Sequence, residues 1–294
     1  MKRREFIKDV AIGSVLLNVS PAVLAQKSYP DLAFIQGESP AKLAQEAISV
    51  LGGIGRFVSK GDKIVVKPNM GWDRKPEQAA NTNPDVVKSI VRLCLDAGAK
   101  EVKVLDNPCN PARRTYARSG ISSAAKDAGA KVPFCSEHKL KRVPINGEWL
   151  KDWEIYTDFL EADKIINVPI AKSHSLSRVT LSMKNWLGCI GGNRNQLHQN
   201  LDAAMVDLAA FFKPVLTVLD AYRVMFRNGP TGGRLSDVKL QKTVVAGVDY
   251  VAVDAMGVTF LDIKPEEMNY LKMANERGYG ENNLEKLKIE KRTV

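Results

Sequence analysis

Apolar and polar positions follow one repeating unit along most of the chain: a capped helix, a glycine and a short apolar strand. In the first unit, Ser39-Pro40 precedes apolar residues at helical spacing, Gly52-Gly53 ends that pattern, and the run Lys63-Ile64-Val65-Val66 follows. The same pattern predicts helices at 40–51, 84–97 and 116–128, and strands at 63–66, 102–105, 131–134, 164–168, 215–219 and 243–246. Such alternation predicts an α/β fold in which helices cover both faces of a mostly parallel sheet.

One segment breaks this rhythm. Residues 139–156 alternate polar and apolar positions over a short distance, which predicts a small antiparallel hairpin insertion within a single α/β domain at 26–294. The run Gly52-Gly53-Ile54-Gly55 does not predict a dinucleotide site. It follows a helix and precedes a strand, which is the reverse of the order that a phosphate-binding loop requires.

The first 25 residues have the pattern of a twin-arginine export signal. Arg3-Arg4 is followed by a variable residue, an aromatic, an aliphatic and a lysine, and then by a short apolar stretch. Small side chains before Gln26 predict cleavage between Ala25 and Gln26. The twin-arginine machinery is therefore an expected partner, and the expected location is the periplasm or another exported compartment. The alternative is an uncleaved anchor, for which the stretch is too short, and no later segment offers about 18 uninterrupted apolar residues.

The charge of the chain favours one kind of partner over another. The sequence has 43 Lys and Arg residues against 33 Asp and Glu residues, a net charge of +10, and removal of the predicted signal with its four basic and two acidic residues leaves +8. The basic residues are scattered among acidic ones, so nucleic acid is not an expected partner. A small anionic molecule, or the anionic face of a membrane, fits the excess better.

The four cysteines show no C-x-x-C spacing, so the sequence does not support a zinc ribbon, thioredoxin chemistry or a contiguous iron-sulfur cluster. Cys94 lies in an apolar helical run and is expected in the core. A metal site assembled from Cys109, Cys135, Cys189 and His198 remains an open alternative, because scattered ligands converge only if the fold brings them together.

Unusual polar residues follow the predicted strands. In an open parallel sheet, ligands bind beyond the carboxyl ends of the strands, where the loops share one crevice. The residues at these positions are Lys67 and Asn69, Asp106, the run Lys172-Ser173-His174, Asp220, and Asp249 in the turn after strand 243–246. We expect these five segments to face one cleft. A divalent metal there would have the carboxylates Asp106, Asp220 and Asp254 as candidate ligands.

The richest segment is 172–200. Apolar residues recur at helical spacing from Val179 to Ile190, which predicts a helix over 178–188 with Lys184 opposite the buried stripe. His174 is a candidate general acid or base, since the ordinary pKa of histidine is about 6.5 and a lysine-rich pocket would lower it. The alternative is that His174 is a hydrogen-bonded residue of the loop framework.

The predicted site thus has two catalytic candidates, His174 and Lys184. The substrate-binding candidates are Lys67, Asn69, Lys172, Arg178, Asn185, Arg194 and Asp220. Cationic and amide groups in this number favour a ligand that carries a carboxylate or a phosphate.

Several motifs in combination resemble the domain-of-unknown-function family 362. They are Lys67-Pro68-Asn69, Val168-Pro169-Ile170-Ala171-Lys172-Ser173-His174, Met183-Lys184-Asn185-Trp186-Leu187-Gly188, Asp220, Asn228-Gly229-Pro230-Thr231-Gly232-Gly233, and Asp249 through Asp254. The resemblance covers nearly all of 26–294. Some members of that family carry a ferredoxin-like module with four-iron four-sulfur clusters, which this sequence lacks. The resemblance implies the location of a site more than a reaction.

Two classes of function fit these observations. The first is an enzyme that acts on a small anionic substrate by acid/base chemistry, with cations holding a carboxylate or phosphate. The second is a binding or delivery protein that holds an anion, a metal or an iron-sulfur or other redox cofactor without turning it over. The sequence leaves the cofactor open.

Overall fold

The computed structural model describes residues 28–294, so the predicted export signal and its cleavage site lie outside the described residues. The strands of the main sheet are β1 (Leu32–Gln36), β2 (Lys63–Pro68), β3 (Glu101–Val104), β6 (Lys164–Val168), β7 (Ile170–His174), β8 (Arg178–Thr180), β9 (Leu216–Met225), β10 (Val238–Gly247) and β11 (Ile289–Thr293). Their order is β11-β1-β10-β9-β6-β2-β3, with β7 pairing to β9 and β8 to β7.

The pairing confirms the predicted α/β fold with a mostly parallel sheet. β2 pairs in parallel with β3 and with β6, and β6 pairs in parallel with β9. β10 lies antiparallel between β9 and β1. A separate antiparallel hairpin of β4 (Leu140–Pro144) and β5 (Asp152–Tyr156) confirms the predicted insertion.

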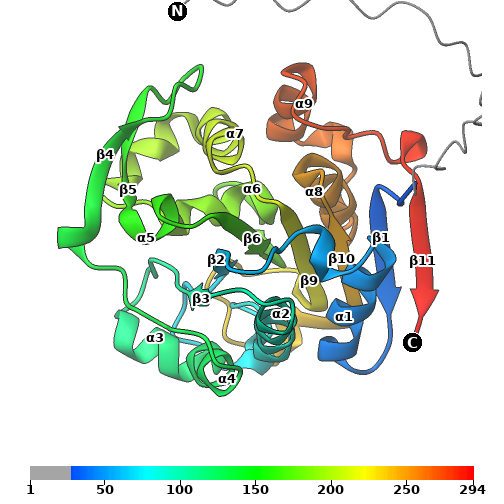
Figure 1. Cartoon of the computed structure of the whole chain (residues 1–294). Helices are drawn as coiled ribbons and strands as arrows, with labels where there is room; N and C mark the ends of the chain where they lie inside the picture. Colours follow the sequence, from blue (N-terminus) through cyan, green and yellow to red (C-terminus); the bar gives the residue numbers. More distant parts are fainter. Residues whose placement is uncertain (1–27) are drawn as a thin grey trace, which may run out of the picture.

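Helices cover the sheet on both faces (Figure 1). One face carries α1 (Pro40–Val50), α2 (Pro84–Asp96), α3 (Ala112–Arg118) and α4 (Ile121–Asp127), and the other carries α5 (Thr157–Leu160), α6 (Ser182–Asn185), α7 (Leu201–Phe212), α8 (Tyr250–Thr259) and α9 (Asn269–Glu276). Each face of the sheet has its own hydrophobic core. Ile64 and Val66 of β2 pack into the core under α1–α4, and Val65 packs into the core on the opposite face. This follows from the two-residue period of a strand and explains why β2 reads as a continuous apolar run.

The predicted helix starts depend on side chains that accept backbone N–H groups. Ser39 accepts a hydrogen bond from the N–H of Lys42 at the start of α1, and Asn83 accepts one from Asp85 at the start of α2. Both helices have proline near their first position, where no backbone N–H is needed.

Two predicted elements near the edge of the sheet are wrong. The helix expected at 116–128 is divided into α3 and α4, because Gly120 adopts a left-handed conformation with φ of 73° between them. The strand expected at 131–134 is reduced to a single bridge between Lys131 and Lys103. Pro133 has no N–H to extend that bridge into a ladder.

The helix predicted over 178–188 is also wrong in its first half. Residues 178–180 form β8, whose Thr180 is opposite Lys172 of β7, and helical structure begins only at Ser182. Asp254 of α8 fixes that start, because its carboxylate accepts hydrogen bonds from the N–H groups of Ser182 (2.6 Å) and Met183 (3.0 Å). The apolar residues do recur at helical spacing, but hydrogen bonds from the start of α6 to Asp254 of α8 determine where the helix begins.

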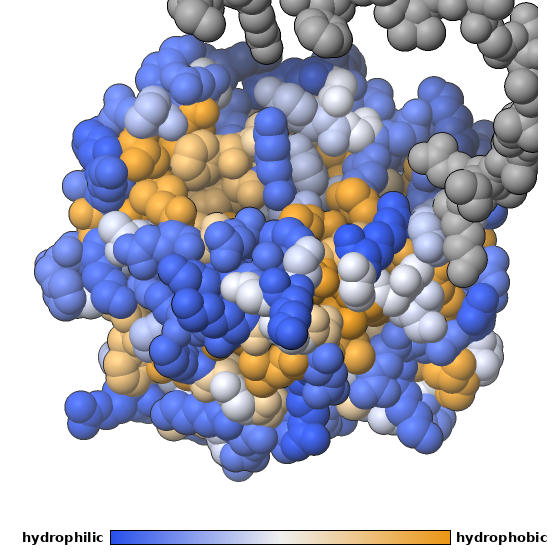
Figure 2. Space-filling view, in the orientation of Figure 1, coloured by the Kyte–Doolittle hydropathy of each residue, from blue (hydrophilic) through white to orange (hydrophobic). Residues whose placement is uncertain are grey.

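The surface of the face drawn in Figure 1 is mostly hydrophilic, with apolar side chains gathered over α5, α7 and the β4–β5 hairpin (Figure 2). Within residues 28–294, we find no helix with the length and apolar character that crossing a membrane demands.

Candidate functional site

A small cavity lies beyond the carboxyl ends of β2, β3 and β6. Its volume is about 80 Å³, and the residues predicted from sequence that line it are Lys67, Asn69, Asp106, Lys172, His174, Lys184, Asn185 and Arg194. A cavity of this size has room for several water molecules or for an oxyanion-sized ligand, and it is smaller than the roughly 300–1,000 Å³ typical of drug-sized ligands. We refer to this cavity as the pocket.

Lys67 forms the floor of the pocket and has no free donor. Its Nζ donates to Asp106 Oδ1 at 2.9 Å, to Asn185 Oδ1 at 3.0 Å and to the carbonyl of Pro68 at 3.0 Å. An ammonium group has three N–H donors, so all of them are used. The Lys67 and Asp106 side chains are almost completely buried, which makes this a buried ion pair and not a free cation.

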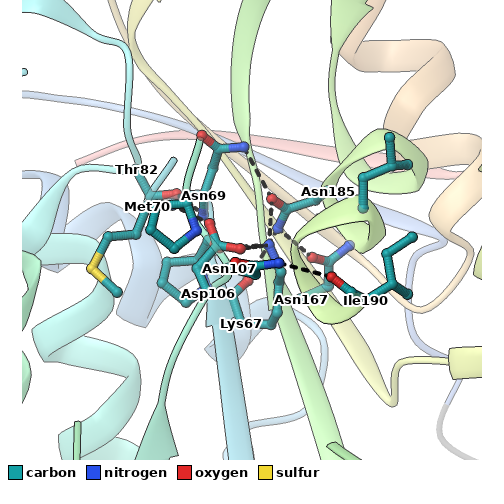
Figure 3. A network of polar contacts seen from close by, with 12 residues as sticks. Lys67, Asn69, Met70, Thr82, Asp106, Asn107, Asn167, Asn185 and Ile190 are labelled. Atoms are coloured by element: carbon teal, nitrogen blue, oxygen red, sulfur yellow. Dashed lines mark hydrogen bonds and ion pairs between the residues drawn. The ribbon is translucent and has the colours of Figure 1, made fainter. Parts of the chain in front are cut away.

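Asn185 joins this pair to the neighbouring strands. Its Oδ1 accepts from Lys67 and from Asn69 Nδ2 (3.2 Å), while its Nδ2 donates to Asn167 Oδ1 at 2.8 Å and to the carbonyl of Lys67 at 3.1 Å. Figure 3 shows the side chains of Lys67, Asp106 and Asn185 pointing toward one another from separate segments. Because nearly every donor and acceptor is paired, these residues form a fixed polar network that supports the pocket.

Gly188 permits this arrangement. It follows α6, and a Cβ atom at this position would overlap Asp106 Oδ1 and lie 2.7 Å from Lys67 Nζ. The backbone at Gly188 also accepts a hydrogen bond from the N–H of Asn107 at 2.8 Å. A side chain here would force the Lys67–Asp106 pair apart, so only glycine allows the close approach.

Lys172 is buried on the wall of the pocket. Its Nζ donates to the carbonyl of Ala80 at 2.5 Å, to Asn69 Oδ1 at 3.1 Å and to the carbonyl of Pro230 at 3.4 Å. Burial lowers the pKa of Lys172 to about 7, and the positive charges of Lys184 and Lys67 act in the same direction. The three oxygen acceptors favour the ammonium form and hold it in place.

His174 has a fixed tautomer. Its Nδ1 accepts hydrogen bonds from the backbone N–H groups of Leu176 (3.1 Å) and Ser177 (3.3 Å), so this nitrogen carries no proton. The proton of the neutral ring therefore lies on Nε2, which is 3.5 Å from Lys184 Nζ. Burial lowers the pKa of His174 to about 3, with further lowering by the charges of Lys184 and Lys172, so the imidazole is neutral at physiological pH.

Lys184 differs from the other two lysines of the pocket. Within residues 28–294, its Nζ has the His174 ring as its hydrogen-bond contact and no oxygen acceptor. Burial lowers the pKa of Lys184 to about 8. The charge of Cys109 raises this pKa, and the charge of Arg194 lowers it further. A contact with the Nε2–H of His174 requires a lone pair on Nζ, which only the neutral amine has.

Thr180 is the polar residue of the pocket that has no partner. It lies at the end of β8, its exposed fraction is 3%, and its Oγ1 has no hydrogen-bond partner in the described part of the chain. No role was predicted from sequence for Thr180 or for Trp72, which also lines the pocket, and Cys109 was predicted only as a candidate metal ligand. Their position in the pocket results from contacts between segments that are far apart in the sequence, and no spacing in the sequence indicates it.

Four predicted residues lie elsewhere. Arg178 is exposed and pairs with Glu267 at 3.2 Å. Asp220 lies within β9, which continues past the predicted strand end at 219 to Met225, and its carboxylate accepts from the N–H groups of Asn83 (2.7 Å) and Tyr222 (2.9 Å). Asp249 and Asp254 accept backbone N–H groups at the starts of α8 and α6. None of the four lines the pocket, so the expectation that all five strand ends face one cleft is wrong for Asp220 and Asp249.

The candidate metal ligands do not come together. Cys94 and Cys189 are buried, Cys135 is half-buried, Cys109 is exposed, and all four thiols are free. Residues 28–294 contain no cluster of three or more His, Cys, Asp or Glu side chains arranged to hold a metal ion. The alternative set of Cys109, Cys135, Cys189 and His198 is therefore not assembled by the fold. Asp106, Asp220 and Asp254 are each bound to different backbone groups.

The fold and pocket define an α/β protein with a small polar cavity at the carboxyl ends of parallel strands. The family model described as Domain of unknown function (DUF362) matches residues 64–259, and the chain belongs to this family. This confirms the resemblance seen in the sequence.

One curated relative and two solved structures are similar to the chain. A thylakoid-associated protein of Synechocystis sp. is 28% identical over 223 residues, which cover 73% of this chain and 68% of that protein. The lactate racemase apoprotein from Thermoanaerobacterium thermosaccharolyticum has a TM-score of 0.47 at 11% identity, covering 78% of this chain and 56% of its own. A Thermotoga maritima protein has a TM-score of 0.41 at 11% identity, covering 80% of this chain and 59% of its own. The chain thus spans less than two thirds of either solved structure.

Proposed function

We propose that the pocket binds a small carboxylate or phosphate and moves a proton on it, so that the protein acts as an enzyme by acid/base chemistry. One observation carries this proposal. Lys184 Nζ, the Nε2–H of His174 and Thr180 Oγ1 all line the pocket, and none of them has an acceptor oxygen within residues 28–294. Since polar groups in protein interiors are nearly always paired, the oxygens of an anionic ligand would complete the site.

The balance of charge supports an anion. The cations Lys172 and Arg194 line the pocket together with the Lys67–Asp106 pair, whose charges cancel. Asp106 is thus the one carboxylate in the lining, and it is already neutralised by Lys67. A negatively charged ligand would be attracted to the remaining cations, and partial burial would strengthen this attraction relative to water.

The two catalytic candidates take different roles in this proposal. Lys184 moves the proton, because its neutral amine has a lone pair that becomes available once the Nε2–H of His174 donates to a ligand oxygen instead, and because its pKa of about 8 is close to physiological pH. His174 keeps its proton on Nε2 and donates a hydrogen bond to a ligand oxygen, where negative charge develops during the reaction. This refines the sequence-based hypothesis that His174 is the general acid or base, since two backbone N–H groups occupy Nδ1.

The Lys184→Ala variant tests the anion site. We expect it to weaken binding of acetate or inorganic phosphate at least about tenfold, which is about 1.4 kcal/mol, because it removes an N–H donor that has no oxygen acceptor within residues 28–294. Isothermal titration calorimetry measures the affinity, and thermal melting should show little loss of stability, because the one hydrogen-bond contact of the Lys184 side chain within residues 28–294 is the long, 3.5 Å contact with His174.

Lys126→Ala is the matched control, since Lys126 is an exposed lysine of α4 outside the pocket. It should leave the affinity unchanged. Equal affinity of both variants and the unmodified protein for acetate and phosphate would rule out Lys184 as an anion ligand.

We also propose that the protein is exported in folded form by the twin-arginine route, on the evidence of its first 25 residues. Changing Arg3 and Arg4 together to lysine should trap a folded precursor in the cytoplasm, because the receptor recognises the arginine pair and not merely its charge. Cell fractionation followed by N-terminal sequencing of the exported form measures this. A normal rate of export in the double variant would contradict the proposal, and a mature N-terminus other than Gln26 would correct the predicted cleavage site.

A further inference from the structure

A thiol lies at the mouth of the pocket, where the proposed reaction gives it no role. Cys109 follows β3, and its backbone N–H donates to the carbonyl of Gly71 at 2.9 Å. Its side chain is exposed and lines the pocket together with Lys172 and Lys184. Among the four cysteines of the sequence, Cys109 is the exposed one.

The charge of Cys109 and the charges of the two lysines influence one another. Burial has the largest effect on the pKa of Lys172 and on that of Lys184. The charge of the Cys109 thiolate has the next largest effect, and it raises both pKa values. All three side chains line the same small cavity of about 80 Å³. The thiolate is the nucleophilic form of cysteine, and the cationic lining of the pocket attracts an anionic electrophile toward the sulfur.

The other three cysteines have the opposite environment. Burial raises the pKa of Cys94 to about 12, and burial also raises the pKa of Cys135 and of Cys189 well above the ordinary value. A buried thiol in apolar surroundings reacts slowly with dissolved reagents. The chain therefore contains three internal controls for the reactivity of Cys109.

A second observation indicates that a ligand occupies the space beside Cys109. Thr180 Oγ1 is buried, has no partner within residues 28–294 and lines the same pocket. Lys184 Nζ also lacks an oxygen acceptor there. A carboxylate bound to these two groups would hold the rest of its molecule within the small cavity that Cys109 also lines.

We propose that Cys109 is a covalent modification site reached through the pocket, and that small carboxylates with an electrophilic carbon alkylate it in preference to neutral electrophiles. This rests on the proposed function, because the donors that bind the anion also position the electrophile. In the reaction, the Cys109 thiolate attacks the electrophilic carbon, a C–S bond forms, and the leaving group departs with the electron pair of its bond to carbon. The proton of the thiol has passed to solvent beforehand. The product places a carboxylate in the pocket and blocks it.

The experiment compares iodoacetate with iodoacetamide, which share the same leaving group and differ in charge. The purified full chain is treated with each reagent at low ionic strength, and mass spectrometry of the four cysteine-containing peptides gives the alkylation rates. The ratio of the iodoacetate rate to the iodoacetamide rate is then divided by the same ratio for the chain unfolded in urea. We expect this normalised ratio to be at least tenfold above one at Cys109, with Cys94, Cys135 and Cys189 nearly unmodified in the folded chain.

Two further measurements separate this proposal from the proposed function. Inorganic phosphate should slow the reaction of Cys109 with iodoacetate, and Lys184→Ala should lower the normalised ratio toward one, whereas Lys126→Ala should not. If calorimetry shows that phosphate binds but the normalised ratio at Cys109 is one, the modification site is wrong and the anion pocket stands. If phosphate neither binds nor protects and the ratio is one, both proposals are wrong.

Discussion

Replacing Lys67 by methionine should lower the free energy of unfolding by about 3–5 kcal/mol, the largest loss that we expect from any single change near the pocket. The substitution keeps the length of the side chain but leaves the buried carboxylate of Asp106 without its cation, and it removes the donor to Asn185 Oδ1. Urea denaturation followed by circular dichroism gives the free energy.

Lys103→Met is the matched control, because Lys103 lies on the neighbouring strand β3 and pairs with another buried carboxylate, that of Asp158 in α5. Asp158 pairs with Lys103 at 2.6 Å but also with Lys139 at 3.0 Å, so one cation remains after the change. We expect a loss of less than about 1 kcal/mol there. The double variant Lys67→Met with Asp106→Asn should recover part of the loss, since the amide needs no cation. Equal losses for Lys67→Met and Lys103→Met would contradict the structural role assigned to Lys67.

The variant His174→Phe should lower turnover by about 100- to 1,000-fold while leaving anion binding largely intact. Phenylalanine keeps the ring shape but removes the Nε2–H that faces the pocket. His174→Gln retains an N–H donor and should therefore keep more activity than His174→Phe. Turnover can be followed as exchange of a carbon-bound hydrogen for deuterium in D₂O, by proton NMR, on a panel of small carboxylates and phosphate esters.

His138→Gln controls for the loss of a histidine as such, since His138 is exposed and outside the pocket. If His174→Phe loses several degrees of melting temperature and no exchange activity, His174 is a framework residue of the loop, and the catalytic role fails.

The pH dependence of the same exchange distinguishes the two candidates. The pKa of His174 is about 3, so its ring stays neutral and contributes no ionisation between pH 5 and 9. The pKa of Lys184 is about 8, and the proposed base is its neutral amine, so kcat/KM should rise as pH increases through about 8. A profile that instead inflects near 6.5, and loses this inflection in His174→Gln, would identify His174 as the titrating group.

Local signals in the sequence were sufficient for most of the parallel sheet. The strands at 63–66, 102–105 and 164–168 were predicted because each is an apolar run preceded by a glycine or a polar turn. The helices that start at Pro40 and Pro84 were predicted because each has its own capping residue. β1 and β11 were missed. Each is a short strand near one end of the described chain, and their pairing with each other joins residues more than 250 positions apart. No local pattern contains that information.

The site likewise combines features that the sequence predicts with features that only the tertiary structure decides. The sequence alone placed Lys67, Asp106, Lys172 and His174 after strands whose carboxyl ends meet, and it placed Lys184 on the helix that follows. It assigned Lys184 to catalysis and Lys67 and Lys172 to substrate binding, but it could not tell which of these lysines have acceptors in the protein. The tertiary structure decided that Lys67 has three acceptors, one of them 118 residues away in sequence, whereas Lys184 has no oxygen acceptor within the described residues. Whether a buried polar group is paired depends on the atoms that surround it in space, and those atoms come from segments that only the folded chain brings together.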